Sequence, residues 1–182
     1  HRAFKTSRAF QFLLALGAQS SLQKGVLWWA ANHRFHHKHS DTPLDPHSVK
    51  QRGFLWAHVG WITAEDYDGT NLDAIGDLAK YPELRWLDRF DIAIPVVLAV
   101  GVYGLGVLLQ HVAPQLGTSG GQMLIWGFFV STIVLFHATV TINSLAHRFG
   151  NRRDDTKDDS RNNVWLALLT FGEGWPNNHH FF

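Results

Sequence analysis

The stretch Asn32-His33-Arg34-Phe35-His36-His37-Lys38-His39-Ser40-Asp41 places four histidines within seven residues of a 182-residue chain that contains no cysteine. On a helix, His33, His36 and His37 stand at i, i+3 and i+4, so their rings share one face and can reach a common metal or a metal pair. Neutral imidazoles without thiolates suit iron, zinc or copper rather than calcium or magnesium. The alternative is a solvated basic helix that binds nothing, but such crowding favours a metal or a proton-transfer role.

Composition limits the classes of protein to which the chain can belong. Its length predicts a single domain over residues 1–182. The formal net charge is +1 and no block of Lys and Arg occurs, so nothing indicates a nucleic-acid-binding surface. The absence of cysteine excludes a disulfide scaffold, an iron–sulfur site and a thiol nucleophile.

The segment before the histidine stretch is apolar at its ends and polar in its centre. The chain begins at His1 without an initiator methionine or a signal-peptide pattern, which predicts a piece of a longer chain. From Phe10 to Ala31 we expect an amphipathic or re-entrant helix that lies against the bilayer or lines a cavity, because Gln19 to Lys24 are mostly polar. The loop Thr42-Pro43-Leu44-Asp45-Pro46-His47 should end the histidine helix.

The middle of the chain divides into a polar part and two apolar segments. Between Glu65 and Asp91, leucines at helical spacing predict two short amphipathic surface helices joined at Pro82. No charged residue occurs in Ile92 to Leu109 or in Leu124 to Ile142, and ~20 apolar residues suffice to cross a bilayer. We therefore expect two spans, at about residues 92–112 and 124–143.

Charge around these segments predicts their orientation. The connector carries no Lys or Arg, whereas the outer flanks carry six, namely Lys80, Arg85, Arg89, Arg148, Arg152 and Arg153. By the positive-inside rule both flanks are cytoplasmic. The expected fold is an all-α integral membrane protein, with a transmembrane hairpin and a cytoplasmic helical cap that holds a two-metal histidine site. A buried hairpin of a soluble helical bundle is the alternative.

Further histidines follow the second apolar segment. Asn143 and His147 stand at i and i+4 on a helix leaving the membrane, which makes them candidate ligands. We read residues 150–161 as a solvated loop and residues 164–171 as a short apolar helix. Near the end, the adjacent His179 and His180 would point ~100° apart on a helix and could serve two neighbouring metals. A hairpin returns all these histidines to one membrane face, and their number exceeds the needs of one metal.

Several segments resemble those of the membrane-bound fatty acyl desaturases of the stearoyl-CoA Δ9 type, a family defined by three histidine boxes. The second box is resembled by His33-Arg34-Phe35-His36-His37, and the end of the third by Asn178-His179-His180. A family segment that supplies a further histidine is resembled by Asn143-Ser144-Leu145-Ala146-His147. His1-Arg2 is similar to the end of the first box, and Asp45-Pro46-His47 and His58-Val59-Gly60-Trp61 resemble further family segments. The chain departs from the family at Pro176, where members commonly have histidine. The Trp-Pro-Asn-Asn-His-His form resembles that of close bacterial relatives, so we interpret it as a subfamily variant.

The resemblance implies a chemistry that the residues can be checked against. Removing hydrogen from an unactivated methylene requires oxygen activated on a redox metal, and the protein supplies ligation and positioning. The resemblance implies two iron ions, O2, and an acyl chain carried on a thioester or a lipid. It also implies a separate electron donor, a ferredoxin or a cytochrome of the b5 type, and a site on the cytoplasmic face of a bacterial membrane.

The resemblance also implies roles for particular residues. The implied iron ligands are His1, His33, His36, His37, His147, His179 and His180, with Asn143 acting through water. Four polar residues are candidates to orient the imidazoles, with ordinary loop or cap polarity as the alternative: Asp41, Asp45, Glu173 and Asn177. Arg34 and Lys38 could meet the anionic head of an acyl thioester. Trp28, Trp29 and Trp175 could wall an acyl tunnel or belong to the core and the interfacial belt.

Two questions stay open from the sequence. The ligand position vacated at Pro176 could be taken by water, Glu173, His39, His47 or His58, or the proline could serve the backbone at the start of a helix. Rival functions are a membrane di-iron hydroxylase or alkane monooxygenase and a histidine-rich metal-binding or transport protein. Transport would place ionisable groups at mid-membrane depth, and only His137 lies inside the apolar segments, which favours an enzyme.

Overall fold

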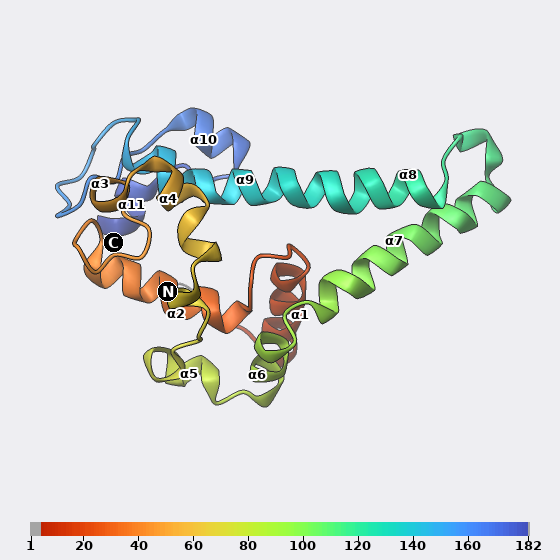
Figure 1. Ribbon diagram of the computed structural model, residues 1–182, viewed down its shortest axis with the longest axis horizontal. Coiled ribbons are helices and arrows are strands. Elements are labelled where there is room, and N and C mark those ends of the chain that lie inside the picture. The colour runs from red at the N-terminus through yellow and green to blue at the C-terminus, as the bar shows by residue number, and fades with distance from the viewer. Residues whose placement is uncertain (1–4, 182) are drawn as a thin grey trace. The chain divides into compact units, whose positions relative to one another are not determined.

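The computed structural model describes residues 5–181, and in that range regular structure is helical apart from one isolated bridge between Asn151 and Asn162 (Figure 1). The expected all-α class is confirmed. The chain divides into two compact units. The described part of the first unit comprises residues 5–29 and 75–136, and that of the second comprises residues 30–74 and 137–181.

The first unit opens with helix α1, Arg8–Gln19, and with the beginning of α2, Val26–His39. One helix from Phe10 to Ala31 was expected, and this prediction is wrong. Leu22 and Lys24 have φ values of 56° and 65°, a left-handed conformation that no α-helix continues through. The polar residues that suggested a re-entrant helix are thus the turn between two helices.

A carboxylate from a later helix fixes the start of α2. Asp88 Oδ1 accepts hydrogen bonds from the backbone N–H groups of Leu27 and Trp28, at 3.0 and 2.8 Å. This satisfies donors that a helix start leaves open. A Cβ added at Gly25 would lie 2.1 Å from Asp88 Oδ1, so only glycine leaves room for the cap.

Two short helices precede the apolar segments, as expected. They are α5, Gly76–Ala79, and α6, Pro82–Arg89, and the proline stands in the first turn of α6. Leu84 and Leu87 of α6 are buried, and α6 packs against α1. Helix α6 therefore belongs to the core of the first unit as well as to its surface, whereas α5 has no buried residue.

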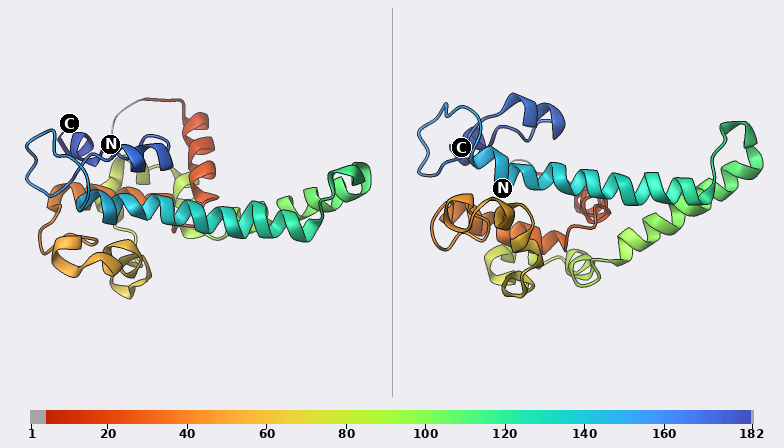
Figure 2. Two further views of the ribbon diagram at one scale, coloured as in Figure 1. Left: turned by 90° about the horizontal axis from the view of Figure 1, so that it is seen from above. Right: turned by 45° about the horizontal axis from the view of Figure 1, so that its top comes forward.

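Both expected spans are confirmed as helices that, by length and composition, could cross a membrane. The first is α7, Ala93–Val112. The second, Gly120–His147, joins α8 (Gly120–Leu124), a π-helical stretch η5 (Ile125–Val130), α9 (Ser131–Ser144) and a 3-10 turn η6 (Leu145–His147) (Figure 2). Only 11% of each apolar window is buried inside the protein, which disfavours a soluble bundle hairpin.

Glycine allows α7 and α8 to approach closely beside the turn that joins them. A Cβ at Gly106 would lie 2.6 Å from the carbonyl oxygen of Ser119, and one at Gly120 would lie 2.8 Å from Val107. Small residues at such crossings are typical of packed membrane helices.

The second unit contains the histidine end of α2 and a set of short helices. These are α3 (Val49–Arg52), α4 (Phe54–His58), η1 (Gly60–Thr63), η2 (Glu65–Tyr67), most of η3 (Leu72–Ile75), α10 (Val164–Leu169) and α11 (Pro176–Phe181). Its buried apolar side chains include Ala57, Trp61 and Val140. The expected short apolar helix near residues 164–171 is confirmed as α10.

The loop before α10 is not solvated throughout, so that interpretation is wrong at its centre. Asp158, Ser160 and Asn162 are buried. The backbone N–H of Arg161 donates to the carbonyl of Ala146 at 2.8 Å, which draws the loop back onto the end of η6. Its polar side chains face protein because the loop closes over α11.

Candidate metal centre

Six histidines of the second unit form two separate groups of three. We call His33, His37 and His179 the outer trio, and His36, His147 and His180 the inner trio. Within each trio the potential ligand atoms lie within 4.8 Å of one another. His36 and His147 are buried, whereas the outer trio is half-buried or exposed. Segments far apart in the sequence thus bring together six of the seven histidines that the resemblance implied. The seventh, His1, lies outside the described residues.

In the outer trio the Nε2 atoms converge. His37 Nε2 lies 3.1 Å from His179 Nε2, and His179 Nε2 lies 3.4 Å from His33 Nε2. His33 and His37 are one helical turn apart on α2, and His179 comes from α11. Burial, together with neighbouring imidazoles, lowers the pKa of His33 to about 3 and that of His37 to about 2. Both rings are therefore neutral at physiological pH, which is the form that binds metal ions.

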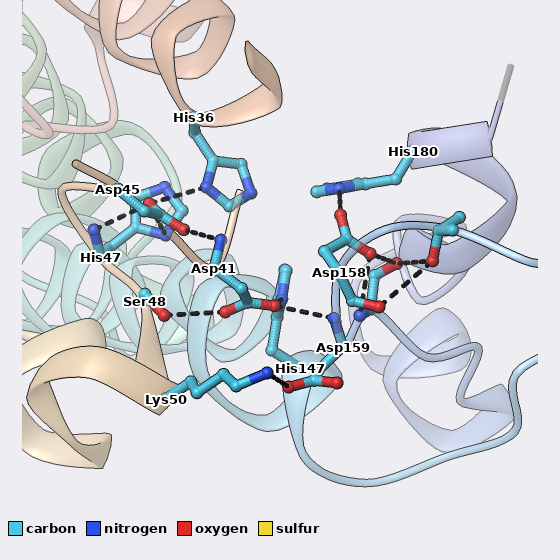
Figure 3. Close-up of polar contacts among 12 residues, drawn as sticks. His36, Asp41, Asp45, His47, Ser48, Lys50, His147, Asp158, Asp159 and His180 are labelled. Carbon is cyan, nitrogen blue, oxygen red and sulfur yellow. Dashed lines mark hydrogen bonds and ion pairs between the residues drawn. The ribbon is translucent and has the colours of Figure 1, made fainter. Parts of the chain in front are cut away.

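In the inner trio an aspartate holds the Nδ1 atom of every ring (Figure 3). His36 Nδ1 donates to Asp45 at 2.9 Å, His147 Nδ1 donates to Asp41 at 3.3 Å, and His180 Nδ1 donates to Asp158. A carboxylate on Nδ1 fixes the proton there and leaves the Nε2 lone pair for a ligand. Three such pairs in one trio are typical of imidazoles that bind a metal ion.

The loop between α2 and α3 holds two of these carboxylates. Asp45 accepts hydrogen bonds from the backbone N–H groups of Asp41 (2.8 Å) and His47 (3.1 Å). Asp41 accepts from Ser48 Oγ and from the N–H of Asp159, both at 2.8 Å. Burial opposes ionisation of Asp41, but the bonds from His147, Asp159 and Ser48 lower its pKa to about 2. Both carboxylates are therefore fixed before any metal binds.

The end of the second apolar helix differs from the expected geometry. Asn143 and His147 were expected one α-helical turn apart, but α9 ends at Ser144 and His147 lies on the 3-10 turn η6. The tighter turn places His147 Nδ1 against Asp41. The Nδ2 atom of Asn143 is buried without a hydrogen-bond partner among residues 5–181. A buried amide of this kind is a binding point for water or another ligand, so its water-mediated role stays a prediction.

Comparison with known proteins agrees with this geometry. Residues 1–182 match the fatty acid desaturase family over their whole length. The chain belongs to this family. It is 36% identical over 183 residues to an sn-1 stearoyl-lipid 9-desaturase from Anabaena variabilis, which covers 100% of the chain and 62% of that protein.

Other similar desaturases come from a second cyanobacterium and from a plant. Identity is 36% over 189 residues to an sn-1 stearoyl-lipid 9-desaturase from Synechocystis, and 36% over 185 residues to an acyl-CoA 5-desaturase from Anemone leveillei. Each alignment covers 100% of this chain and 53% of the relative. The chain thus spans between half and two thirds of the length of these relatives.

In this desaturase-family chain, three more histidines are candidates for the ligand position vacated at Pro176. His47 is buried, stacks on His36 with ring centroids 4.1 Å apart, and forms a third possible ligand group with His36 and Asp45. His58 instead contacts Ser144 Oγ (2.9 Å) and His137 Nδ1 (3.0 Å). His39 packs against Phe35 with ring centroids 4.6 Å apart. Of the three, only His47 adjoins a trio.

Around Pro176 the buried side chains lie at the start of α11 and join it to the preceding loop. Pro176 is buried and begins this helix. Asn177 Oδ1 accepts from the N–H groups of Arg153 (2.9 Å) and Asp154 (2.8 Å), and its Nδ2 donates to the carbonyl of Asp154 (3.1 Å). Asn177 thus joins α11 to the preceding loop rather than to a histidine ring. Glu173 lies at the surface, where partial burial of its carboxyl raises its pKa.

The candidate substrate-binding residues lie in both units. In the first unit Trp28 is buried and meets Trp29 edge to face, with centroids 5.4 Å apart. In the second unit, Arg34 Nη1 donates to the carbonyl of Ala74 at 3.3 Å, and Lys38 and Trp175 are exposed. Their roles toward an acyl chain or its head group stay predictions.

Asp158 is the functional candidate that sequence reasoning missed. Burial opposes its ionisation, but hydrogen bonds from His180 and Ser160 lower its pKa far below the usual range. Ser160 N–H and Oγ both bond to Asp158 Oδ1. The Asp158-Asp159-Ser160 sequence is typical of such a local turn, because aspartate accepts from the N–H two residues on. That signal was present, but a charged stretch favoured a solvated loop.

Proposed function

We propose that the protein is an oxygen-dependent acyl desaturase that introduces a cis double bond into a saturated acyl chain. The observation that carries the proposal is the pair of separate histidine trios, one of which has a carboxylate on every ring. Family membership supports it, and so do relatives named as desaturases. The rival hydroxylase or monooxygenase activity would use a similar centre but leave oxygen in the product.

The donor set fits two iron ions. Two trios of imidazoles, with carboxylates behind one of them and no thiol in the chain, suit a redox metal of intermediate softness. His33, His37 and His179 would hold one ion, and His36, His147 and His180 would hold the other. Bound iron would supply the oxidising power toward a methylene group that no side chain has.

The chain's own residues fix and shield this centre. Asp45, Asp41 and Asp158 keep the Nδ1 protons of the inner trio in place, so that the three Nε2 lone pairs are left for a ligand. His47 stacks on His36 and keeps water from that ring. We assign the buried Nδ2 of Asn143 to a water that adjoins the ions.

The setting of the reaction is also part of the proposal. The two apolar helices would embed the protein in a bacterial cytoplasmic membrane, with the centre on the cytoplasmic face, where the arginine-rich flanks lie. The acyl substrate would be a lipid or a thioester, and Arg34 and Lys38 would meet its anionic head. Two electrons per turnover would come from a ferredoxin or a cytochrome b5-type protein.

Metal analysis with Mössbauer spectroscopy of the purified protein tests the centre. We expect two coupled iron ions per chain, and stoichiometric zinc or copper without iron would redirect the assignment to metal binding or transport. Mass spectrometry of products separates the enzymatic alternatives, because a desaturase yields an acyl chain two hydrogens lighter and a hydroxylase yields one oxygen heavier.

A further inference from the structure

Helix α10 presents a row of large apolar side chains to its surroundings. On one side it buries Leu166 and Ala167. Its other side and the residues that follow are exposed, and we call this surface the α10 face. It consists of five apolar side chains, with these exposed fractions: Val164 52%, Trp165 77%, Leu168 68%, Leu169 58% and Phe171 100%. Contiguous apolar surface of this kind is rare on proteins that face water and marks a contact site.

The α10 face begins beside the end of the second apolar helix. The N–H of Arg161 bonds to Ala146 of η6 at 2.8 Å, and Asn163 Nδ2 donates to the carbonyl of Phe149 at 3.4 Å. Figures 1 and 2 show α10 next to the end of α9, within the same unit. Phe149, which lies between η6 and α10 in the sequence, is another exposed apolar side chain.

The surrounding charges indicate which occupant would cover this face. Arg148 is exposed on the chain directly after η6, where it could meet lipid phosphates. Tryptophan and phenylalanine beside arginine at the end of a span are typical of the boundary between head groups and acyl chains. A bilayer is therefore the occupant that both the apolar and the charged residues fit.

We propose that the α10 face inserts into the interfacial layer of the bilayer beside the second span. This inference rests on the membrane embedding in the proposed function. It assigns to α10 a lipid contact that is separate from the two spans.

Insertion of α10 bears on the metal centre through a short, tight connection. Gly172 N–H donates to Ala167 at 2.7 Å, and Asn163 N–H donates to Gly174 at 2.7 Å. A Cβ at Gly174 would lie 2.0 Å from the Ala167 nitrogen, so the returning chain packs directly on α10. Pro176 and α11 follow at once, and α11 supplies one histidine to each trio. The depth of α10 in lipid therefore fixes the starting point of α11.

Site-directed spin labelling tests the insertion, because these residues contain no native cysteine. Nitroxides would be attached to the Trp165→Cys and Leu168→Cys variants in nanodiscs of phosphatidylcholine and phosphatidylglycerol. Ile133→Cys in the second span is the lipid control, and Lys157→Cys in the exposed loop is the water control. Collision with apolar O2 and with the water-soluble complex NiEDDA would be measured at each site.

We expect collision with O2 to exceed collision with NiEDDA at the two α10 sites and at Ile133. At Lys157 we expect collision with NiEDDA to be the greater. High NiEDDA collision at α10 with a lipid-exposed Ile133 would overturn the inference while membrane embedding stands. Low collision with both reagents at α10 would also overturn it, because protein would then cover the face. A water-exposed Ile133 would instead refute the embedding itself.

Discussion

The Asp45→Asn substitution tests whether the carboxylates that bind the Nδ1 atoms of the inner trio support metal binding. Asp45 is fully buried, and Oδ1 accepts from His36 Nδ1 and the His47 N–H while Oδ2 accepts from the Asp41 N–H. Asparagine has nearly the same shape but replaces one acceptor oxygen with a donor. Whichever way the amide lies, one buried N–H group faces another donor.

The expected magnitude follows from these contacts. A buried polar group left unsatisfied costs about 1–3 kcal/mol, and His36 also loses the charge that favours its ligand tautomer. Loss of a partner behind a metal-bound histidine typically weakens metal affinity about 10–100-fold, which corresponds to about 1.4–2.7 kcal/mol. We expect the iron affinity of the variant to fall by about 10–100-fold while the helices remain folded.

Competition with a chelator measures the loss, with iron content followed over time and helicity checked by circular dichroism. Asp159→Asn is the matched control, because the Asp159 side chain makes a partly exposed ion pair with Lys50 at 3.2 Å. Such a pair contributes about 0–1 kcal/mol. If Asp45→Asn retains iron as well as Asp159→Asn does, the carboxylate does not support the metal and the assignment of the inner trio fails.

Three further substitutions test the site and the fold. His180→Ala should abolish desaturation and remove about one iron ion per chain without affecting membrane insertion. The control His39→Ala changes a histidine of α2 outside both trios and should keep iron and activity. Equal losses in the two variants would contradict the ligand assignment. Pro176→Ala should reduce iron retention, because the start of α11 loses its fixed φ and the folded state loses about 0.4–1 kcal/mol of stability. Unchanged iron content would refute this backbone role. Gly25→Ala should lower the melting temperature, because the added methyl group displaces the Asp88 cap of α2 at a cost of about 1 kcal/mol or more. The control Gly17→Ala should leave the melting temperature unchanged, because a Cβ there meets nothing within 4 Å. Equal melting temperatures for the two variants would refute the role of the cap.

Local periodicity predicted the elements that depend on neighbours in sequence. The histidine helix, the two apolar helices and α10 all follow from spacing and composition within one segment. The break between α1 and α2 did not, because its cause includes the cap by Asp88, about 60 residues away. The 3-10 turn at His147 was missed for a similar reason, since contacts with Asp41 and Arg161 from distant segments accompany it.

The candidate site divides in the same way between what spacing specifies and what tertiary structure specifies. The histidines could be identified from the sequence because metal ligands on helices cluster at short intervals. The carboxylates on their Nδ1 atoms come from loops, where no period marks them. Asp41 and Asp45 were candidates because they lie beside the histidine helix, whereas Asp158 reaches His180 only after the loop closes over α11.

Helical geometry explains why two adjacent histidine pairs form two trios rather than one cluster. Neighbouring residues on a helix point ~100° apart, whereas residues four apart point almost the same way. His37 therefore joins His33 in the outer trio, and the adjacent His36 faces the inner trio; on α11, His179 and His180 divide in the same manner. Each His-His pair contributes one ring to each trio, and His147 completes the inner one. A substitution that rotates α11 by one residue would thus disturb both trios together, whereas loss of a single ring should first affect the trio to which it belongs.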